Sequence, residues 1–284
     1  MKKSLKIAVT MILAMALSVA FAGCKTGSKK AVAGVQSGTT GEYYVKGDAD
    51  WGFDGFSNID VNGYDNGGLA VQAMLNGQID FVVIDAAPAQ KLAESASFKG
   101  KIKVIDYDLT EEEYAFGVDK NNAELLAKVN EIIAKIKSEG TYTTIMNKYF
   151  NGEEVTGVTS GVKDINKADT QFVVATNAAF APFEYKIGDK FAGVDMEIAQ
   201  IIADELGMEL VIEDMAFEAV VTSVGNNGVD IAMAGLTVNE TRKQSVNFSD
   251  SYYNASQKVI VKVEDKSFDG CKSAADVEAV LKAK

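Results

Sequence analysis

The sequence contains no histidine, and it has only 2 cysteines and 2 prolines among its 284 residues. Without histidine there is no Ser-His-Asp or Cys-His catalytic centre, no histidine proton shuttle and no histidine-ligated zinc. Two cysteines alone cannot complete a zinc site, and so few prolines argue against a proline-rich linker. The familiar histidine-dependent chemistries are therefore excluded, and we expect neither a metal nor an organic cofactor.

Positive charge is also scarce. The chain has 28 Lys and Arg against 40 Asp and Glu, a formal net charge of -12. Nucleic acid is therefore not an expected partner, because binding it requires side chains that neutralise phosphates. Hydrophobic residues make up 47% and charged residues 24% of the chain, which is typical of a globular protein with one large domain or two lobes.

The first residues have the features of a secretion signal. Lys2, Lys3 and Lys6 precede an apolar run over residues 7–22, which is short for a membrane-spanning helix. A basic start, an apolar segment and small residues before a cleavage point predict a signal peptide over residues 1–23. A short N-terminal membrane anchor is the alternative.

The end of this segment, Phe21-Ala22-Gly23-Cys24, resembles a bacterial lipobox. The resemblance implies that Cys24 carries lipid and that residues 24–29 form a tether. Cys271 then has no partner within the chain, so we expect no disulfide. We expect a monomer outside the cytoplasm, held at the membrane by its lipid.

Strand and helix patterns alternate in two parts of the chain. Such alternation predicts right-handed strand-helix-strand units and mainly parallel sheets. Two α/β lobes follow from two such units, and a single doubly wound sheet is the alternative. The predicted strands are 31–35, 79–85, 172–175, 210–212 and 229–235, and the predicted helices include 70–75, 125–136, 194–206, 218–224 and one that begins near Ala274.

One short pattern occurs in both parts. Asn76-Gly77-Gln78-Ile79-Asp80 and Asn227-Gly228-Val229-Asp230 each stop a helix and lead into a strand. Asp80 and Asp230 are therefore interpreted as structural acids at strand ends. Residues 151–169 show no sustained periodicity and are predicted to be a surface connection.

Several segments of the chain form a recognisable set. They are Thr176 to Tyr185 (Thr-Asn-Ala-Ala-Phe-Ala-Pro-Phe-Glu-Tyr), Gly193-Val194-Asp195, Gly235-Leu236-Thr237, Arg242, Phe248 to Tyr252, Val35 to Gly41, Val83-Ile84-Asp85 and Lys148-Tyr149-Phe150. Together they resemble the polar-amino-acid solute-binding proteins, the capture subunits of bacterial ABC importers. The resemblance implies an α/β, two-lobed type II periplasmic-binding-protein (Venus flytrap) fold, a binding function without catalysis, and an ABC permease as partner.

The order of these segments is unusual. In the family the Pro-Phe-Glu segment comes first, whereas here the Ser-Gly-Thr-Thr segment precedes it. The order implies a circular permutation, because joining Lys284 to Lys30 restores the family order. Lobe 2 is then expected to comprise 30–108 and 264–284, and lobe 1 to comprise 109–263, with crossings near Asp108 and Val263. A truncated tandem pair of binding domains is the alternative.

The resemblance also implies a ligand site between the lobes. A guanidinium forms paired, charge-assisted bonds with a carboxylate, and Arg242 stands where the family places that residue. Thr39-Thr40-Gly41 would add oriented amides from a helix start. Gly235 and Thr237 would contribute backbone and hydroxyl contacts, and Asp85 would bind the ammonium of an amino acid.

The side-chain pocket follows from the same resemblance. Phe180 and Phe217 would flank the side chain of the bound amino acid, and Asn177 and Gln36 would face into the pocket. Because the last two are neutral, a polar uncharged ligand such as glutamine is slightly favoured. Glu184 could pair with a cationic side chain, so a basic ligand, arginine or lysine, is the alternative.

Two alternative functions remain. A dehydratase-like enzyme could use Glu184 or Asp85 for proton transfer, and an amino-acid sensor for a membrane receptor would need the same binding site.

Residues 47–68 depart from the family and are rich in glycine and aromatic residues such as Trp51. A calcium loop fails the EF-hand rule because Phe53 occupies the position of its glycine, so this segment has no assigned role.

Overall fold

The computed structural model describes residues 30–284, and Ala31–Lys284 form one compact unit. The predictions for the signal peptide 1–23, for Cys24 and for the tether 24–29 lie outside the described residues. Cys271 is a free, half-buried cysteine within the described part. None of the helices described there has the length and apolarity needed to cross a membrane.

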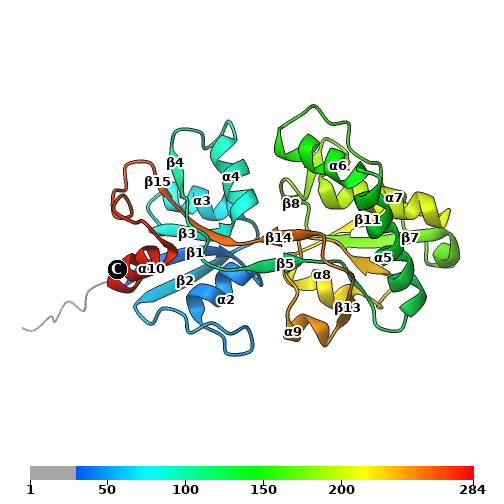
Figure 1. Ribbon diagram of the computed structural model, residues 1–284, viewed down its shortest axis with the longest axis horizontal. Coiled ribbons are helices and arrows are strands. Elements are labelled where there is room, and N and C mark those ends of the chain that lie inside the picture. Colours follow the sequence, from blue (N-terminus) through cyan, green and yellow to red (C-terminus); the bar gives the residue numbers. More distant parts are fainter. Residues whose placement is uncertain (1–29) are drawn as a thin grey trace, which may run out of the picture. The chain divides into compact units, whose positions relative to one another are not determined.

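The compact unit contains two five-stranded sheets, and each is the centre of one lobe (Figure 1). The sheet of lobe 2 has the order β2-β1-β3-β15-β4, and that of lobe 1 has the order β11-β7-β12-β6-β13. In lobe 2 the strands are β1 (Ala31–Gln36), β2 (Ile59–Tyr64), β3 (Phe81–Asp85), β4 (Ile102–Ile105) and β15 (Gln257–Lys262). In lobe 1 they are β6 (Gly117–Asp119), β7 (Gln171–Thr176), β11 (Glu209–Asp214), β12 (Ile231–Ala232) and β13 (Val246–Phe248).

The two sheets share one arrangement of strand directions. In each sheet the first three strands in the order are parallel, and the fourth pairs antiparallel with its neighbours. The sheets are thus evenly mixed, whereas the sequence predicts mainly parallel sheets, and the alternative of a single continuous sheet is wrong. The α/β fold with two lobes is confirmed.

Helices cover the sheets because each has an apolar stripe. In α5, for example, Leu125, Val129 and Ile132 recur at helical spacing and are buried. The helices of lobe 2 are α2 (Thr40–Lys46), α3 (Gly67–Leu75), α4 (Ala86–Glu94) and α10 (Ala274–Ala283). Those of lobe 1 are α5 (Ala123–Ser138), α6 (Thr141–Phe150), α7 (Val194–Leu206), α8 (Phe217–Ser223) and α9 (Glu240–Lys243), with the short strands β8 (Ala179–Phe180), β9 (Glu184–Ile187) and β10 (Lys190–Ala192).

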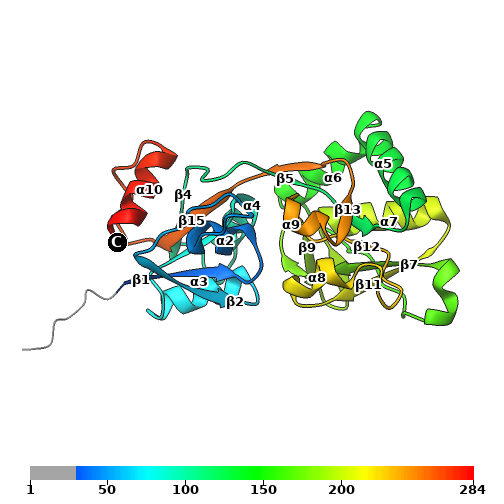
Figure 2. The same cartoon turned by 90° about the horizontal axis from the view of Figure 1, so that it is seen from below.

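Two short strands join the lobes. The chain leaves lobe 2 through β5 (Glu112–Tyr114) and returns through β14 (Tyr253–Ala255), which pair with each other antiparallel (Figure 2). The second crossing expected near Val263 is therefore misplaced, because β15 lies between β3 and β4 in lobe 2. Val259, Ile260 and Val261 are completely buried there, so this apolar strand completes the sheet instead of leading out of lobe 1.

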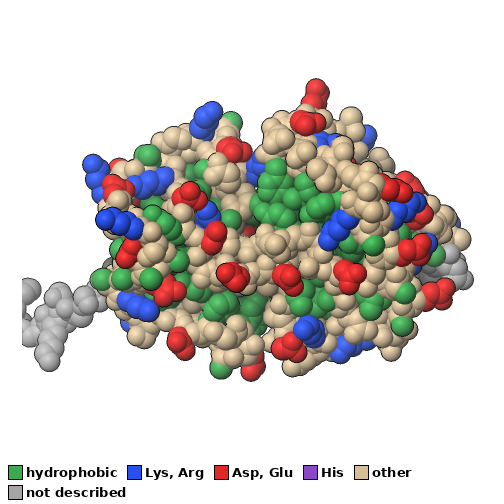
Figure 3. All heavy atoms as spheres, in the orientation of Figure 1, with side chains coloured by type: hydrophobic (Ala, Val, Ile, Leu, Met, Phe, Trp, Pro, Cys, Tyr) green, Lys and Arg blue, Asp and Glu red, His purple; other side chains and the backbone are tan. Residues whose placement is uncertain are grey.

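The lobes also touch beside the joining strands. Lys91 of α4 donates a hydrogen bond to the carbonyl oxygen of Phe150 at the end of α6, at 2.9 Å. The ring of Phe150 packs against Tyr253 of β14, with centroids 5.7 Å apart. Figure 3 shows apolar side chains gathered between α4 and α6, above β14.

The pattern that occurs twice in the sequence has the same role in both lobes. Asp80 accepts a hydrogen bond from the amide of Val32 at 2.7 Å and donates its own amide to the carbonyl of Val32 at 2.8 Å. Asp230 makes the same pair of bonds with Val173, at 2.8 and 2.9 Å. Each acid ties the start of a central strand to its neighbour, so the structural interpretation of both is confirmed.

The residues between α6 and β7 form the surface connection that the sequence predicts. Within residues 151–169, Val158 forms an isolated bridge with Phe191, and the amide of Gly161 bonds to Leu210. The side chain of Val162 is 86% exposed. A short 3-10 helix, η1 (Ile165–Thr170), then leads into β7.

We predict that Asp230→Ala destabilises the protein by about 1–3 kcal/mol, because the partly buried amide of Val173 loses its acceptor. Asp189→Ala, which changes an exposed acid in the same lobe, is the control and should cost less than about 0.5 kcal/mol. The free energy of unfolding is measured by urea titration. Equal values for the two variants would contradict the structural role of Asp230.

Candidate functional site

Polar side chains from both lobes meet where the central strands end. β1 ends at Gln36, β3 ends at Asp85, and Asn177 follows β7 directly. The carboxyl ends of parallel strands are the usual place for ligands in α/β folds. The amide of Gln36 donates to the side-chain oxygen of Asn177 at 2.9 Å, so these two predicted residues are brought together across the lobes.

Arg242 is a buried cation. It lies on the short helix α9, where its backbone amide donates to the capping side chain of Asn239 at 2.8 Å. Its guanidinium donates to the carbonyls of Thr237 in lobe 1, at 2.8 Å, and Gly38 in lobe 2, at 3.1 Å. Burial lowers the pKa of Arg242 to about 10, which leaves it protonated at neutral pH. Within residues 30–284 it forms no ion pair with a carboxylate.

Asp85 is a buried acid without a cationic partner in the described part of the chain. It occupies the N-cap position of α4 but makes no side-chain capping bond, so the alternative of a simple helix cap is wrong. Its carboxylate accepts a hydrogen bond from the hydroxyl of Tyr114. Burial, and secondly the negative charge of Glu112, raise the pKa of Asp85 to about 7.

Glu112 on β5 links the two lobes, and sequence reasoning missed it. Its carboxylate accepts hydrogen bonds from the hydroxyls of Thr40 in lobe 2 and Thr237 in lobe 1, both at 2.6 Å. Gln257 and Thr110 donate to its other oxygen, at 3.0 and 2.6 Å. Glu112 stands between Glu111 and Glu113, and three consecutive glutamates suggest a solvent-exposed segment. Successive side chains of a β-strand point to opposite faces, however, and Glu112 is only 8% exposed.

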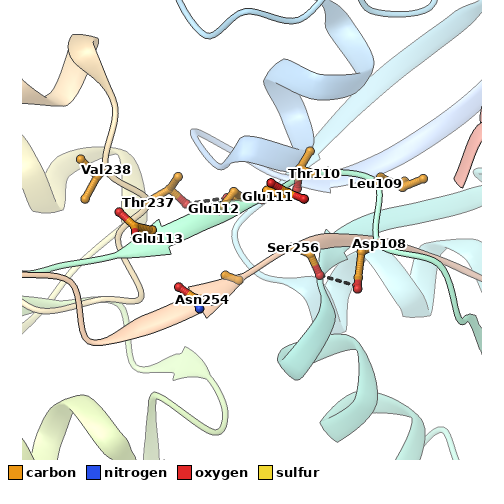
Figure 4. A pocket seen from close by; sticks show the side chains of 11 residues that line it. Asp108, Leu109, Thr110, Glu111, Glu112, Glu113, Thr237, Val238, Asn254 and Ser256 are labelled. Carbon is orange, nitrogen blue, oxygen red and sulfur yellow. Dashed lines mark hydrogen bonds between the residues drawn. The ribbon is translucent and has the colours of Figure 1, made fainter. Parts of the chain in front are cut away.

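A cavity of about 930 Å³ runs along β5 and β14 (Figure 4). The side chains of Thr237 and Glu112 point toward each other there, and Ser256 bonds to Asp108 at 2.6 Å. Its lining contains acids and no lysine or arginine. The lining residues are Asp108 to Glu113, Thr237, Val238 and Asn254 to Ser256.

Three further predicted contact residues have structural roles within the protein. The hydroxyl of Thr39 donates to the carbonyl of Gln36 at 2.8 Å, and the amide of Gly235 donates to Asp195 at 3.0 Å. Gly41 is required for close packing, since a Cβ there would lie 2.9 Å from the carbonyl oxygen of Val83. These groups hold α2 and the loop after β12 in place beside Arg242 and Asp85.

Aromatic side chains surround the polar groups. The ring of Phe180 is buried and stacks near Phe183, with centroids 6.2 Å apart. The ring of Phe217 lies 5.3 Å from the guanidinium carbon of Arg242, and that of Trp51 lies 5.1 Å from the same carbon. Trp51, from the segment without an assigned role, is thus a second residue that sequence reasoning missed.

Glu184 is the most isolated acid of this region. Both of its carboxylate oxygens are buried and have no hydrogen-bond partner in the described structure. Burial raises the pKa of Glu184 well above its ordinary value, and the negative charges of Asp195 and Asp85 raise it further. A buried acid in this state would be stabilised by a cation.

Comparison with known proteins gives the family. The model for bacterial extracellular solute-binding proteins, family 3, matches residues 23–152 and 172–282. The arginine-binding extracellular protein ArtP of Bacillus subtilis is 35% identical over 111 residues, which cover 39% of this chain and 41% of that protein. Cyclohexadienyl dehydratase of Pseudomonas aeruginosa is 32% identical over 80 residues, covering 28% of this chain and 30% of that protein.

A solved structure of a mutant of ArgBP from T. maritima aligns over 90% of this chain and 87% of that chain, with 11% identity and a TM-score of 0.41. The chain spans less than half the length of the curated relatives named above. The family model, however, matches most of the chain in two segments. The chain therefore belongs to the bacterial extracellular solute-binding proteins of family 3.

Proposed function

We propose that the protein captures an L-amino acid with a cationic side chain between its two lobes and delivers it to an ABC importer. In this proposal the protein acts as a monomer outside the cytoplasm, anchored to the membrane by a lipid on Cys24. The family and the arginine-binding relative support an amino acid as the ligand. The glutamine-like ligand favoured by the sequence becomes the alternative.

The observation that carries this ligand class is the charge imbalance of the site. Asp85, Glu112 and Glu184 are buried acids, each at most 8% exposed, whereas Arg242 is the buried cation between the lobes. Uncompensated buried charge is costly. A ligand with one carboxylate and two cationic groups has a net positive charge and reduces this excess of negative charge, whereas zwitterionic glutamine leaves it unchanged.

The geometry suggests a role for each group. The ligand carboxylate would bind the guanidinium of Arg242 and the backbone amide of Thr40 at the start of α2, and its ammonium would bind Asp85. The side chain would run past Phe180 and place its cation near Glu184, which has no other partner in the described structure. Glutamine in the same position would leave that acid without a counter-charge.

Closure of the lobes would follow from contacts that exist only when they meet. Gln36 with Asn177 and Arg242 with Gly38 already bond across the lobes. A ligand held by Asp85 from lobe 2 and Arg242 from lobe 1 binds the closed arrangement better than the open one, so it shifts the equilibrium toward closure. The paired strands β5 and β14 would absorb the rotation.

The enzyme and sensor alternatives use the same site. A protonated Glu184 could in principle transfer a proton, and one relative is named a dehydratase. Holding both charged ends of an amino acid, however, requires no proton transfer. Recovery of candidate ligands unchanged after long incubation with the protein would reject the enzyme, whereas a sensor would share the binding step.

We also propose that the chain is a circular permutant of the family. Val277 and Leu281 of α10 pack in one core with Ala33 and Val35 of β1, as expected if the helix once preceded that strand in the sequence. The family model matches two segments separated by the connection before β7.

We predict that calorimetric titration with the common L-amino acids gives the strongest binding for arginine or lysine. Arg242→Ala should weaken binding at least a hundredfold, because the ligand carboxylate loses its paired donors. Lys243→Ala, which removes the exposed cation next to it, should change affinity less than about twofold. Near-normal binding by Arg242→Ala would reject the site, and a clear preference for glutamine would reject the cationic ligand.

We predict that affinity decreases as the pH falls from 8 to 6. Asp85 has a pKa of about 7 in the free protein, and the ligand ammonium favours its ionised form, so acidification below that pKa costs up to about tenfold in affinity per pH unit. Binding at pH 6 should therefore release protons, measurable by calorimetry in buffers of different ionisation enthalpy. Asp85→Asn should bind more weakly at pH 8 and lose most of this dependence; an unchanged pH profile would contradict the role of Asp85.

We predict that a rearranged chain folds and binds like the original. It would begin at Gln171, run to Lys284, continue through a short Gly-Ser linker to Lys30 and end at Phe150. Its affinity and unfolding midpoint should stay close to those of the parent, because every strand of both sheets is kept intact. A matched chain that begins inside β7, at Ala175, should fail to fold. Failure of both rearranged chains would contradict the permutation.

A further inference from the structure

The segment without an assigned role forms a compact hairpin beside α2. The amide of Asp48 donates to the carbonyl of Phe53 at 2.8 Å, and the reverse bond is 2.9 Å. The side chain of Asp48 accepts from the amides of Asp50 and Trp51, at 2.9 and 3.2 Å. These bonds shape the tip that carries Trp51.

Glycines close the base of this hairpin. Gly47 and Gly55 have φ angles of +85° and +67°, in the region that favours glycine. A Cβ on Gly55 would lie 2.4 Å from the amide nitrogen of Gly47, so the two backbones touch. The ring of Phe53 packs on Tyr44 of α2, with centroids 5.5 Å apart. The hairpin is therefore held as one piece with lobe 2.

Trp51 projects from this piece onto the opposite lobe. Its ring stacks on Tyr43 of α2, with centroids 4.2 Å apart and an angle of 21° between the planes. The Trp51 ring also lies 5.1 Å from the guanidinium carbon of Arg242, whose second aromatic neighbour, Phe217, is at 5.3 Å. The guanidinium thus lies close to one ring from each lobe.

We propose that Trp51 is a positioning residue that holds Arg242 in the closed state and slows release of the ligand. The proposal rests on the proposed binding function and extends it to a residue that need not touch the ligand. A tryptophan face attracts a guanidinium most strongly when water is excluded. Because Trp51 belongs to lobe 2 and Arg242 to lobe 1, this attraction exists only when the lobes meet, so it stabilises closure and not either lobe alone.

The test compares Trp51→Ala and Trp51→Phe with Asp50→Ala, an exposed position on the same hairpin. Stopped-flow measurements with arginine and lysine give the two rate constants. Trp51→Ala should raise the dissociation rate about three- to thirtyfold, the equivalent of one desolvated cation–π contact, and change the association rate less than about twofold. Trp51→Phe should recover part of the loss, and Asp50→Ala should match the parent.

A second measurement uses fluorescence. Trp51 is the sole tryptophan of the chain, so quenching of its fluorescence by acrylamide reports on the exposure of this one residue. Saturating arginine or lysine should make Trp51 less accessible to acrylamide in the parent and equally in Lys243→Ala, because closure brings the ring against Arg242. Dissociation rates unchanged by Trp51→Ala, or acrylamide quenching unchanged by a saturating amount of the bound amino acid, would overturn the proposal. Absence of binding to any amino acid by the parent would instead reject the proposed function.

Discussion

Arg242 imposes the main constraint on this molecule. The residue is only 8% exposed, and its guanidinium donates hydrogen bonds to backbone carbonyls of both lobes. Such a group is costly to bury unless its remaining hydrogen-bond donors find partners. Arg242 has two carbonyls and two aromatic faces but no carboxylate in the described part of the chain. The surroundings therefore keep it in place while leaving it available to an anion, which is the condition for recognising a carboxylate ligand.

The buried acids near Arg242 explain why a ligand with a cationic group would bind at this site. Asp85 and Glu184 are held where burial and neighbouring negative charges raise their pKa values. Their carboxylates are thus stabilised by an arriving cation more than by the protein alone. Glu112 adds a different element, since one carboxylate on β5 gathers a threonine from each lobe. Binding and closure can be coupled because the same small region contains the charges and the joining strands.

The two lobes share the same local arrangement of strands. Each has three parallel strands followed by antiparallel neighbours, and each has an aspartate that ties two central strands together. Two short strands are the covalent connection between them. Rigid lobes with a narrow connection allow rotation without rearrangement of either core, so a contact across the cleft, such as that of Trp51 with Arg242, acts on the rotation alone.

The sequence by itself determined the elements whose signals are local. Apolar periodicity located α5, α7 and half of the strands of the two five-stranded sheets, and the Asn-Gly-to-Asp pattern correctly marked Asp80 and Asp230. Family motifs selected Arg242 and Asp85, which are both buried, and their role in binding stays a prediction. Tertiary structure decided that β15 belongs to lobe 2, that Glu112 is buried and that Trp51 covers Arg242. These three depend on partners far away in the chain, and neither composition nor spacing encodes which distant residues a strand or a ring will meet.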